Sequence, residues 1–311
     1  MTPTPDFLDH HRPDVPDLVV PRGVTSFYLQ GRPVRGRLVR LGALADALLS
    51  RHDNPDAIKR LTGEALALTA GLAAGLKFKG SFSVQAKVDG PVTLLIADCT
   101  DTGALRGYAK FDPERLKALK AVNASTLLGQ GYLAFTVDQG PDTDRYQGLV
   151  SIEGDTLVDM ALHYFATSEQ IPTHLHLACV KTERGWRAGA LILQRIAHGG
   201  GEDNHHDEDP EESWTTAKAL ARTISDAELL DDTLSPEQLL FRLFHQEEVH
   251  AERPRALAYG CRCSRAHLAG ILGSFSATDL DDMACDGVIT MTCEFCNFDF
   301  NFVQADLRPP I

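Results

Sequence analysis

Four cysteines near the end of the sequence have the types and the spacing of metal ligands. Cys261 and Cys263 form a CxC pair, and Cys293 and Cys296 form a CxxC pair after 29 intervening residues. Zn²⁺ prefers thiolates in a tetrahedral arrangement, and each close pair can occupy two corners of the tetrahedron. We therefore predict one zinc ion held by these four cysteines. Both pairs are also able to close as disulfides when an oxidant reaches them.

The segment that carries these cysteines is too short for a large core. Cys261 to Ile311 comprises 51 residues, so we expect it to need the metal in order to fold. Structural zinc contributes about 10–16 kcal/mol to folding, and oxidation of its ligands would unfold the segment. Arg262, Arg265 and His267 are close to the cysteines in sequence, and positive charge favours the reactive thiolate. The pattern is thus compatible with a purely structural zinc site and with an oxidant-triggered switch.

The remaining cysteines have no partner at ligand spacing. We expect Cys285 to be a small buried apolar residue, and Cys99 and Cys179 to lie in the core because their surroundings resemble apolar strands. Seven cysteines, five of them between Cys261 and Cys296, do not suit the paired disulfides of a secreted protein. A reducing cytoplasm is the expected compartment.

Other candidate sites are weak. His245 and His250 are five residues apart, whereas the metalloprotease motif needs a spacing of four, so a charged helix surface is expected there. Gly129 and Gly131 lack the third glycine of a dinucleotide loop and predict a tight turn between strands. Two further groups of histidines are interpreted as ordinary strand or linker residues rather than ligands: His174 and His176, and His198, His205 and His206.

The elements ahead of the cysteines predict a mixed α+β domain, mainly of antiparallel strands. Asn54-Pro55 precedes a helix with an apolar stripe from Ile58 to Leu72. Alternation from Phe82 to Val88, a turn at Asp89-Gly90 and a second run at Val92–Ala97 predict a hairpin. Further strands are expected at 27–29, 34–39, 105–111, 132–137, 146–152, 175–180 and 188–193, and further helices at 43–50 and 157–167.

A composition change marks the end of this domain. Residues 198–212 contain three glycines and seven carboxylates and no apolar side chain, which is typical of a solvated tether. Two amphipathic helices, starting at Ser213-Trp214 and at Ser235-Pro236-Glu237, follow it and are expected to dock reversibly on the main domain. The predicted division is therefore 1–197 (α+β core domain), 198–255 (tether and helical linker) and 256–311 (zinc-binding redox-switch domain).

Composition and charge exclude several classes of protein. The 311 residues, 43% hydrophobic and 23% charged, fit an ordinary globular protein of about two domains. The formal charge of −13, with three Lys or Arg against seven Asp or Glu after residue 260, disfavours nucleic acid as a partner. Without a long apolar run or a signal-peptide pattern, we expect neither membrane insertion nor export. Phe295, Phe298, Phe300 and Phe302 then predict either a small core or a protein-contact surface.

Several blocks of the sequence resemble the 33-kDa redox-regulated heat-shock chaperones of bacteria. The CxC and CxxC pairs, with the surrounding run Tyr259–Arg265, are similar to that family's signature. The similarity extends from about Thr25 to Phe302, and the acidic run 198–212 and Cys285 depart from the family's pattern. Its other blocks are Leu128-Gly-Gln-Gly-Tyr132, Arg145-Tyr-Gln-Gly148, Glu153-Gly-Asp155, Tyr164-Phe165 and Ser168-Glu-Gln170.

This resemblance implies an ATP-independent holding chaperone, not an enzyme, that is inactive while reduced and zinc-bound. In the family's scheme, peroxide or hypochlorite would form the disulfides Cys261–Cys263 and Cys293–Cys296, the zinc would leave and the linker would unfold. The chain would then form a homodimer and bind unfolded client proteins during oxidative and heat stress. The residues alone leave open which apolar surface would bind clients: the linker helices, the sheet or both.

Two other functions are compatible with the same cysteines. One is a constitutive zinc-ribbon adaptor for nucleic acid or the transcription machinery, which the acidic charge disfavours. The other is a thiol oxidoreductase that uses the CxxC pair, which is disfavoured because four zinc-bound thiolates leave no free nucleophile.

Overall fold

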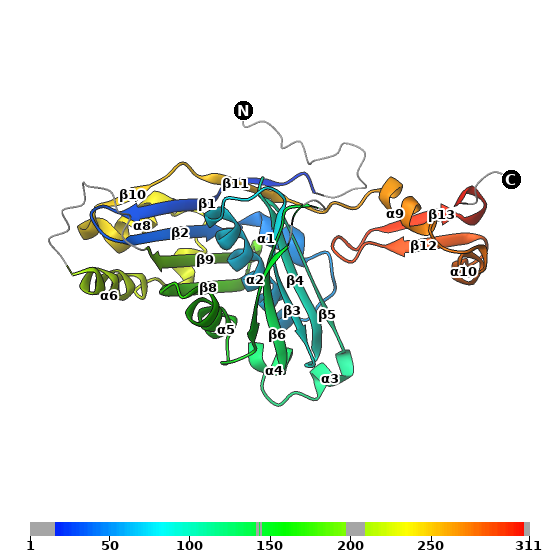
Figure 1. The fold of residues 1–311 in the computed structure, drawn as a ribbon, viewed down its shortest axis with the longest axis horizontal. Helices are drawn as coiled ribbons and strands as arrows, with labels where there is room; N and C mark the ends of the chain where they lie inside the picture. The colour runs from blue at the N-terminus through cyan, green and yellow to red at the C-terminus, as the bar shows by residue number, and fades with distance from the viewer. Residues whose placement is uncertain (1–15, 141–142, 144, 197–208, 308–311) are drawn as a thin grey trace.

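The structure is a computed structural model that describes residues 16–140, 143, 145–196 and 209–307. The chain has the predicted α+β class, with a large, mostly antiparallel sheet, helices against it and a two-stranded sheet near the C-terminus (Figure 1). The strands of the large sheet are β1 (Val19–Leu29), β2 (Val34–Arg40), β3 (Ser81–Val88), β4 (Val92–Thr100), β5 (Ala104–Phe111), β6 (Gly131–Asp138), β7 (Tyr146–Ser151), β8 (Thr173–Thr182), β9 (Gly185–Arg195), β10 (Val249–Ala251) and β11 (Arg255–Tyr259).

The sheet has two arms that meet at β11. The strand order is β7-β6-β3-β4-β5-β11-β1-β2-β9-β8, and β10 pairs with β1. β11 runs parallel to β5, with Ala258 opposite Ala104, and antiparallel to β1, with Ala258 opposite Val19. Figure 1 shows the arm of β1, β2, β8 and β9 at a steep angle to the arm of β3 to β6. Strand β11, which lies directly before the first cysteine pair, therefore joins the two arms.

Helix α2 (Asp56–Gly75) fills the space between the arms. The predicted stripe is confirmed, since its residues from Ile58 to Leu72 are buried and the helix contacts strands of both arms. At Gly71 a Cβ atom would lie 2.5 Å from the Ile192 side chain of β9. Glycine at this position lets the helix approach the sheet closely. The shorter helix α1 (Ala43–Leu49) packs beside α2, as predicted for 43–50.

The predicted strands are confirmed, whereas β10 and β11 were not predicted. In the predicted hairpin, Val84 of β3 lies opposite Ala97 of β4, so the two apolar faces coincide. The Gly129–Gly131 turn does not join two strands: Gly129, with φ of 70°, ends helix α4 (Ala124–Leu128), and β6 begins at Gly131. Helix α3 (Pro113–Lys117) precedes α4 in the same connection.

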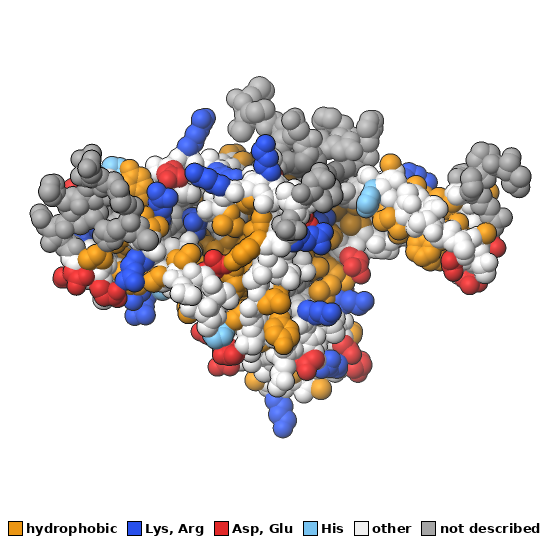
Figure 2. Space-filling model, in the orientation of Figure 1, with side chains coloured by type: hydrophobic (Ala, Val, Ile, Leu, Met, Phe, Trp, Pro, Cys, Tyr) orange, Lys and Arg blue, Asp and Glu red, His pale blue; other side chains and the backbone are white. Residues whose placement is uncertain are grey.

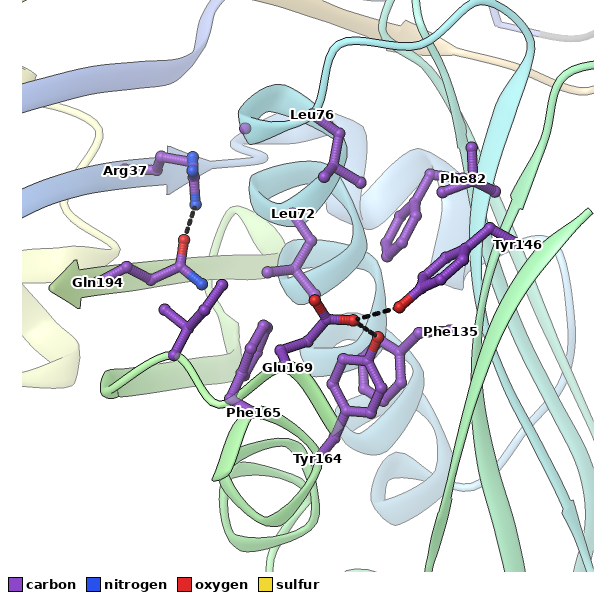
Figure 3. Close-up of a pocket in the computed structure, with 13 residues that line it drawn as sticks. Arg37, Leu72, Leu76, Phe82, Phe135, Tyr146, Tyr164, Phe165, Glu169 and Gln194 are labelled. Atoms are coloured by element: carbon purple, nitrogen blue, oxygen red, sulfur yellow. Dashed lines mark hydrogen bonds between the residues drawn. The ribbon is translucent and has the colours of Figure 1, made fainter. Parts of the chain in front are cut away.

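The helix predicted for 157–167 changes type before its end. Helix α5 (Leu157–Tyr164) is followed by a π-helical turn, η1 (Phe165–Glu169), which ends at Gln170 in the left-handed conformation with φ of 55°. π-Helical turns are rare, and they are common at functional sites. The turn places Phe165 and Glu169 at the open end of the space between the arms (Figure 3).

The first linker helix begins earlier than predicted, and the linker contains more helix. Helix α6 (Pro210–Ala221) starts inside the acidic run because the Asp209 side chain accepts a hydrogen bond from the backbone of Glu211, and acidic residues favour a helix N-terminus. The earlier part of that run, 198–208, with its three histidines, lies outside the described residues. Helices α7 (Asp226–Leu229) and α8 (Pro236–Phe244) follow, and α7 was not predicted.

The end of the chain forms a small separate layer. It comprises α9 (Arg265–Leu272), α10 (Ala277–Met283) and a hairpin of β12 (Val288–Thr292) and β13 (Asp299–Val303), followed by the 3₁₀ turn η3 (Gln304–Leu307). Phe300 and Phe302 are buried inside it, and Figure 1 shows it projecting beyond β5. Among the described residues, no helix is long and apolar enough to cross a membrane.

Candidate metal centre and its contacts with the sheet

The four predicted ligand residues converge on one point. The sulfur atoms of Cys261, Cys263, Cys293 and Cys296 all lie within 4.8 Å of one another, and none of them is in a disulfide. Individual Sγ–Sγ distances are 3.4 Å for Cys261–Cys263, 3.6 Å for Cys261–Cys293 and 3.5 Å for Cys263–Cys296. A tetrahedron with metal–sulfur bonds of about 2.3 Å has edges of about 3.8 Å. The cluster is therefore of the right size to hold one metal ion.

Hydrogen bonds among the sulfurs shift their acidities in opposite directions. The bond with Cys263 lowers the pKa of Cys261 to about 7, and the bond with Cys261 lowers the pKa of Cys293. Hydrogen bonds with the other sulfurs, followed by burial, raise the pKa values of Cys263 and Cys296, and repulsion by the charge of Cys261 adds to these shifts. A bound dication would remove that repulsion and favour deprotonation of all four.

Local backbone features bring the two pairs together. Strand β11 ends at Tyr259, and a Cβ atom at Gly260 would lie 2.5 Å from the backbone of Ala104, so the chain leaves the sheet in close contact with β5. Ser264 then caps α9 through the backbone of His267. The second pair lies in the loop between β12 and β13, which Asn297 closes in the left-handed conformation with φ of 53°.

Side chains between the cysteines connect the centre to the sheet. Arg262, the middle residue of the CxC pair, forms an ion pair with Asp98 of β4. Within the CxxC pair, Phe295 lies under the guanidinium of Arg106 at 4.1 Å, and Glu294 accepts a hydrogen bond of 3.2 Å from the Tyr108 hydroxyl. These contacts fasten both cysteine pairs to the same part of β4 and β5.

The linker covers an apolar face of the other arm. Figure 1 shows α6 and α8 against β1, β2, β8 and β9. We call the covered surface the linker-facing patch; its residues are Phe27, Leu29, Val34, Leu38, Ala178, Leu191 and Leu193. The linker residues packed on it include Trp214, Ala217, Leu239, Leu240, Leu243 and Phe244. The predicted docking of amphipathic linker helices on the main domain is thereby confirmed, and its reversibility stays a prediction.

A buried arginine holds the linker in place. The guanidinium of Arg40 donates hydrogen bonds to the backbone carbonyls of Glu228, at 2.7 Å, Leu229, at 2.8 Å, and Leu234. Burial lowers its pKa, which the nearby Asp231 and Asp232 oppose. The carbonyls at the end of α7, which carry partial negative charge, are therefore satisfied by a residue of β2.

The other sequence candidates are not at the centre. His174 and His176 lie on β8, where burial lowers the pKa of His174 to about 4 and His176 contacts Asp226 at 2.8 Å. His245 and His250 do not share a helix surface, since α8 ends at Phe244 and His250 lies on β10, stacked on Tyr28. That part of the sequence prediction was wrong.

The remaining cysteines confirm the prediction in two cases and contradict it in one. Cys99 and Cys179 are buried, and burial raises the pKa of each to about 12, so both are protonated and unreactive at neutral pH. Cys285 is exposed rather than buried. Its backbone pairs with that of Val288 in the turn before β12, and its side chain lies at the surface of the small layer rather than in its core.

Residues of the sheet that support the centre were missed. Arg106 and Tyr108 lie on a predicted strand, Asp98 lies one residue beyond the predicted end of β4, and none of them has a ligand spacing that could single it out. The only signal was that Asp98 and Arg106 are charged residues in otherwise apolar runs. Arg265 lies over the Phe302 ring at 4.6 Å, so both arginines near the first cysteine pair have partners.

Comparisons with known proteins agree on one family. The model of the family described as "Hsp33 protein" matches residues 23–303. A protein of Caulobacter vibrioides named 33 kDa chaperonin is 44% identical over 283 residues, covering 88% of this chain and 92% of that protein. One of Ectopseudomonas mendocina with the same name is 35% identical, covering 90% and 92%. The crystal structure of the 33 kDa chaperonin of Thermotoga maritima has the same fold, with a TM-score of 0.74, 22% identity and coverage of 92% and 96%.

Proposed function

Because the chain belongs to the Hsp33 protein family, we propose that it is a molecular chaperone that holds unfolded proteins and is switched on by oxidation of its four clustered cysteines. In this proposal the protein is not an enzyme and needs no ATP. Cys261, Cys263, Cys293 and Cys296 hold one zinc ion in the reduced form. When bound, the ion neutralises the thiolates and stabilises the small C-terminal layer.

The observation that best supports the proposal is that the linker helices cover the linker-facing patch. Phe27, Leu38 and Leu191 of this patch are at most 1% exposed, and linker helices bury them. Removal of the linker would open a contiguous apolar surface, and such a surface binds unfolded chains. The linker residues that leave it are equally apolar, so both sides of this contact are candidate client-binding surfaces.

Two molecules of peroxide per chain are enough to oxidise the four cysteines to two disulfides. Each peroxide accepts two electrons from one pair of zinc-bound thiolates, its O–O bond breaks as a disulfide forms, and its two oxygen atoms take up protons from the solvent and leave as two molecules of water. We propose the pairs Cys261–Cys263 and Cys293–Cys296, which is the pairing that the resemblance to the chaperone family implies. The oxidised sulfurs no longer hold the metal, since zinc is bound by thiolates.

The chain connects the cysteines to the linker through the sheet. β10 and β11 follow α8 after one 3₁₀ turn, η2 (His245–Glu247), and β11 lies between β1 and β5 just before Cys261. Loss of the ordered cysteine loops removes the contacts of Arg262 and Phe295 with β4 and β5. The segment between the linker and the centre is then held less firmly, and we propose that the linker detaches with it.

The remaining assignments follow the same scheme. We propose the division 1–197 for the core domain, 198–255 for the linker and 256–311 for the switch domain. In this division the linker contributes β10 to the large sheet, and β11 spans the boundary between the linker and the switch domain. Partners are unfolded clients and, after oxidation, a second copy of the chain. The charge of −13 argues against nucleic acid as a partner and helps to keep an exposed apolar surface soluble. The proposed location is the cytoplasm.

One experiment follows metal, thiols and activity together. The reduced, zinc-loaded protein is treated with peroxide at mildly raised temperature, and zinc release, free thiols and suppression of aggregation of a heat-unfolded test protein are measured over time. We expect one zinc to leave as four thiols disappear and holding activity to appear. If zinc stays bound, or leaves without any gain in activity, the centre is purely structural and the proposal is wrong.

A further inference from the structure

A cavity lies between the two arms of the sheet, far from the cysteines in the sequence. Its volume is about 260 Å³, and it opens beside the C-terminal end of α2 (Figure 3). One side is formed by Phe82, Phe135 and Tyr146 of β3, β6 and β7, and the other by Arg37 of β2 and Gln194 of β9. Figure 2 shows hydrophobic side chains gathered over the centre of this face, between the arms. None of these residues serves the metal centre.

The aromatic wall of the cavity is rigidly built. Tyr164 stacks on Phe135 with a centroid distance of 3.9 Å, and Phe165 meets the Tyr164 ring edge-on at 5.3 Å. Gly148 of β7 leaves room for this stack, since a Cβ atom there would lie 2.4 Å from the Tyr164 ring. The π-helical turn η1 carries Phe165 and Glu169 into the same wall. Two family blocks of the sequence, 145–148 and 164–170, thus form much of this wall.

The negative charge at the cavity is already matched. Glu169 accepts hydrogen bonds from the hydroxyls of Tyr146, at 3.1 Å, and Tyr164. Burial, followed by the contact with Glu169, raises the pKa of Tyr164, so its hydroxyl stays protonated and continues to donate. The carboxylate therefore has two donors fixed in place and requires no cation from a ligand.

The positive charge at the cavity is not matched in the same way. Arg37 donates to the side-chain oxygen of Gln194 at 2.9 Å, and within the described residues it has no carboxylate at ion-pairing distance. Burial lowers its pKa, the charge of Arg35 lowers it further, and Glu252 opposes this from a longer range. The end of α2 offers partial negative charge nearby, since Gly75 packs against the guanidinium. Of the five N–H donors of the guanidinium, one is bonded to this neutral amide.

We propose that this cavity binds an amphipathic carboxylate, with its apolar tail between the aromatic walls and its carboxylate on Arg37. Gln194 assists, because Figure 3 shows its amide nitrogen turned toward the cavity while its oxygen is occupied by Arg37. A guanidinium and a carboxylate form the strongest pairing available here, and the apolar walls supply the remaining affinity. Two sources share this chemistry: a free carboxylic acid of medium length, and the C-terminal residue of a peptide that ends in an apolar side chain. The inference is independent of the redox switch.

Calorimetric titration of the full-length, reduced, zinc-loaded protein tests this inference. The probes are octanoate, octan-1-ol as the tail without the charge, and the peptide acetyl-Leu-Leu-Phe with a free or an amidated C-terminus. We expect saturable binding of octanoate and at least tenfold weaker binding of octanol. Binding of the free peptide but not the amide identifies a chain terminus as a second source of the carboxylate. Equal binding of octanoate and octanol, or no binding of either acid, overturns the inference.

Three variants locate the site. Arg37→Gln keeps a polar side chain but removes its charge. We expect it to weaken the binding of octanoate by at least tenfold and to leave the binding of octan-1-ol unchanged. Lys77→Gln is the matched control, since it also removes one positive charge, but Lys77 is exposed beyond the end of α2 and does not line the cavity; we expect less than a twofold effect. Val137→Trp fills the cavity from its partly exposed rim and should abolish binding of both tails. If Arg37→Gln binds octanoate as tightly as the unmodified protein does, the carboxylate lies elsewhere and the proposal is wrong.

Discussion

The ring of Phe295 lies under the guanidinium of Arg106, with 4.1 Å between the ring centroid and the guanidinium carbon. Phe295 is one of the two residues between Cys293 and Cys296, and Arg106 is on β5 of the large sheet. The second cysteine pair is therefore attached to the sheet through a side chain within the pair itself. A change in the cysteine loop therefore alters a contact of β5, which is the strand that pairs with β11.

Arg106→Ala should make the cysteines easier to oxidise. It removes the cation–π contact with Phe295 and the 3.4 Å ion pair with Asp98, at a cost to docking of about 1 kcal/mol. If thiol oxidation requires the loop to leave the sheet, we expect thiol loss in peroxide to be about fivefold faster, with unchanged zinc content beforehand. Lys110→Ala, at an exposed position on the same strand, is the control. Equal rates in both variants would show that docking does not protect the sulfurs.

Arg40→Met should release the linker without oxidation. The substitution fills similar space but leaves the carbonyls of Glu228, Leu229 and Leu234 without their donor, and each unsatisfied buried group costs about 1–3 kcal/mol. We expect the reduced, zinc-loaded variant to bind a hydrophobic dye, to lose hydrogen-exchange protection in α7 and α8, and to suppress aggregation of a test protein.

The control for that variant is Arg195→Ala, which removes an ion pair to the exposed Glu211 at the other end of the linker. Surface pairs contribute at most about 1 kcal/mol, so we expect little change. A reduced Arg40→Met protein that remains inactive while its linker exchanges freely would refute the link between linker release and activity.

Local patterns of the sequence predicted the elements, but not the contacts between distant ones. Alternation located β3 and β4, and ligand spacing located the four cysteines. The contacts of Arg40 with backbone carbonyls have no sequence signature, because any residue supplies a carbonyl. β11 was missed because a short run in the middle of a sheet has no alternation to distinguish it. Helix α6 was placed too late because the acidic residues of its first turn were interpreted as tether.

The cysteine cluster and the isolated Cys285 should respond differently to substitution. Cys263→Ser removes one of four close sulfurs, and we expect bound zinc to fall from one per chain to nearly none, with loss of the C-terminal layer, since structural zinc contributes about 10–16 kcal/mol to folding. Cys285→Ser lies outside the cluster and is exposed, so zinc content should remain at one. Zinc is measured by elemental analysis after gel filtration. Retention of zinc by Cys263→Ser would exclude this residue as a ligand.

Glu64 on α2 should make stability depend on pH. Burial raises its pKa from 4.5 to about 7, although Arg60 lowers it. A raised folded-state pKa means that the folded protein binds the proton more tightly than the unfolded chain, so Glu64 has no effect below about pH 4.5 and destabilises the fold increasingly up to about pH 7. The full effect is at most about 3 kcal/mol.

Glu64→Gln should remove this dependence, because an amide does not titrate. We expect the variant's unfolding free energy in urea, relative to that of the unmodified protein, to be higher at pH 8 than at pH 5, by about 1–3 kcal/mol. The cysteines also become protonated at low pH, with the opposite effect on stability, but this contribution is common to both proteins and cancels in the difference. Glu183→Gln, at an exposed turn between β8 and β9, is the control and should show no such change. A difference between Glu64→Gln and the unmodified protein that is constant with pH would mean that Glu64 is ionised normally within the fold.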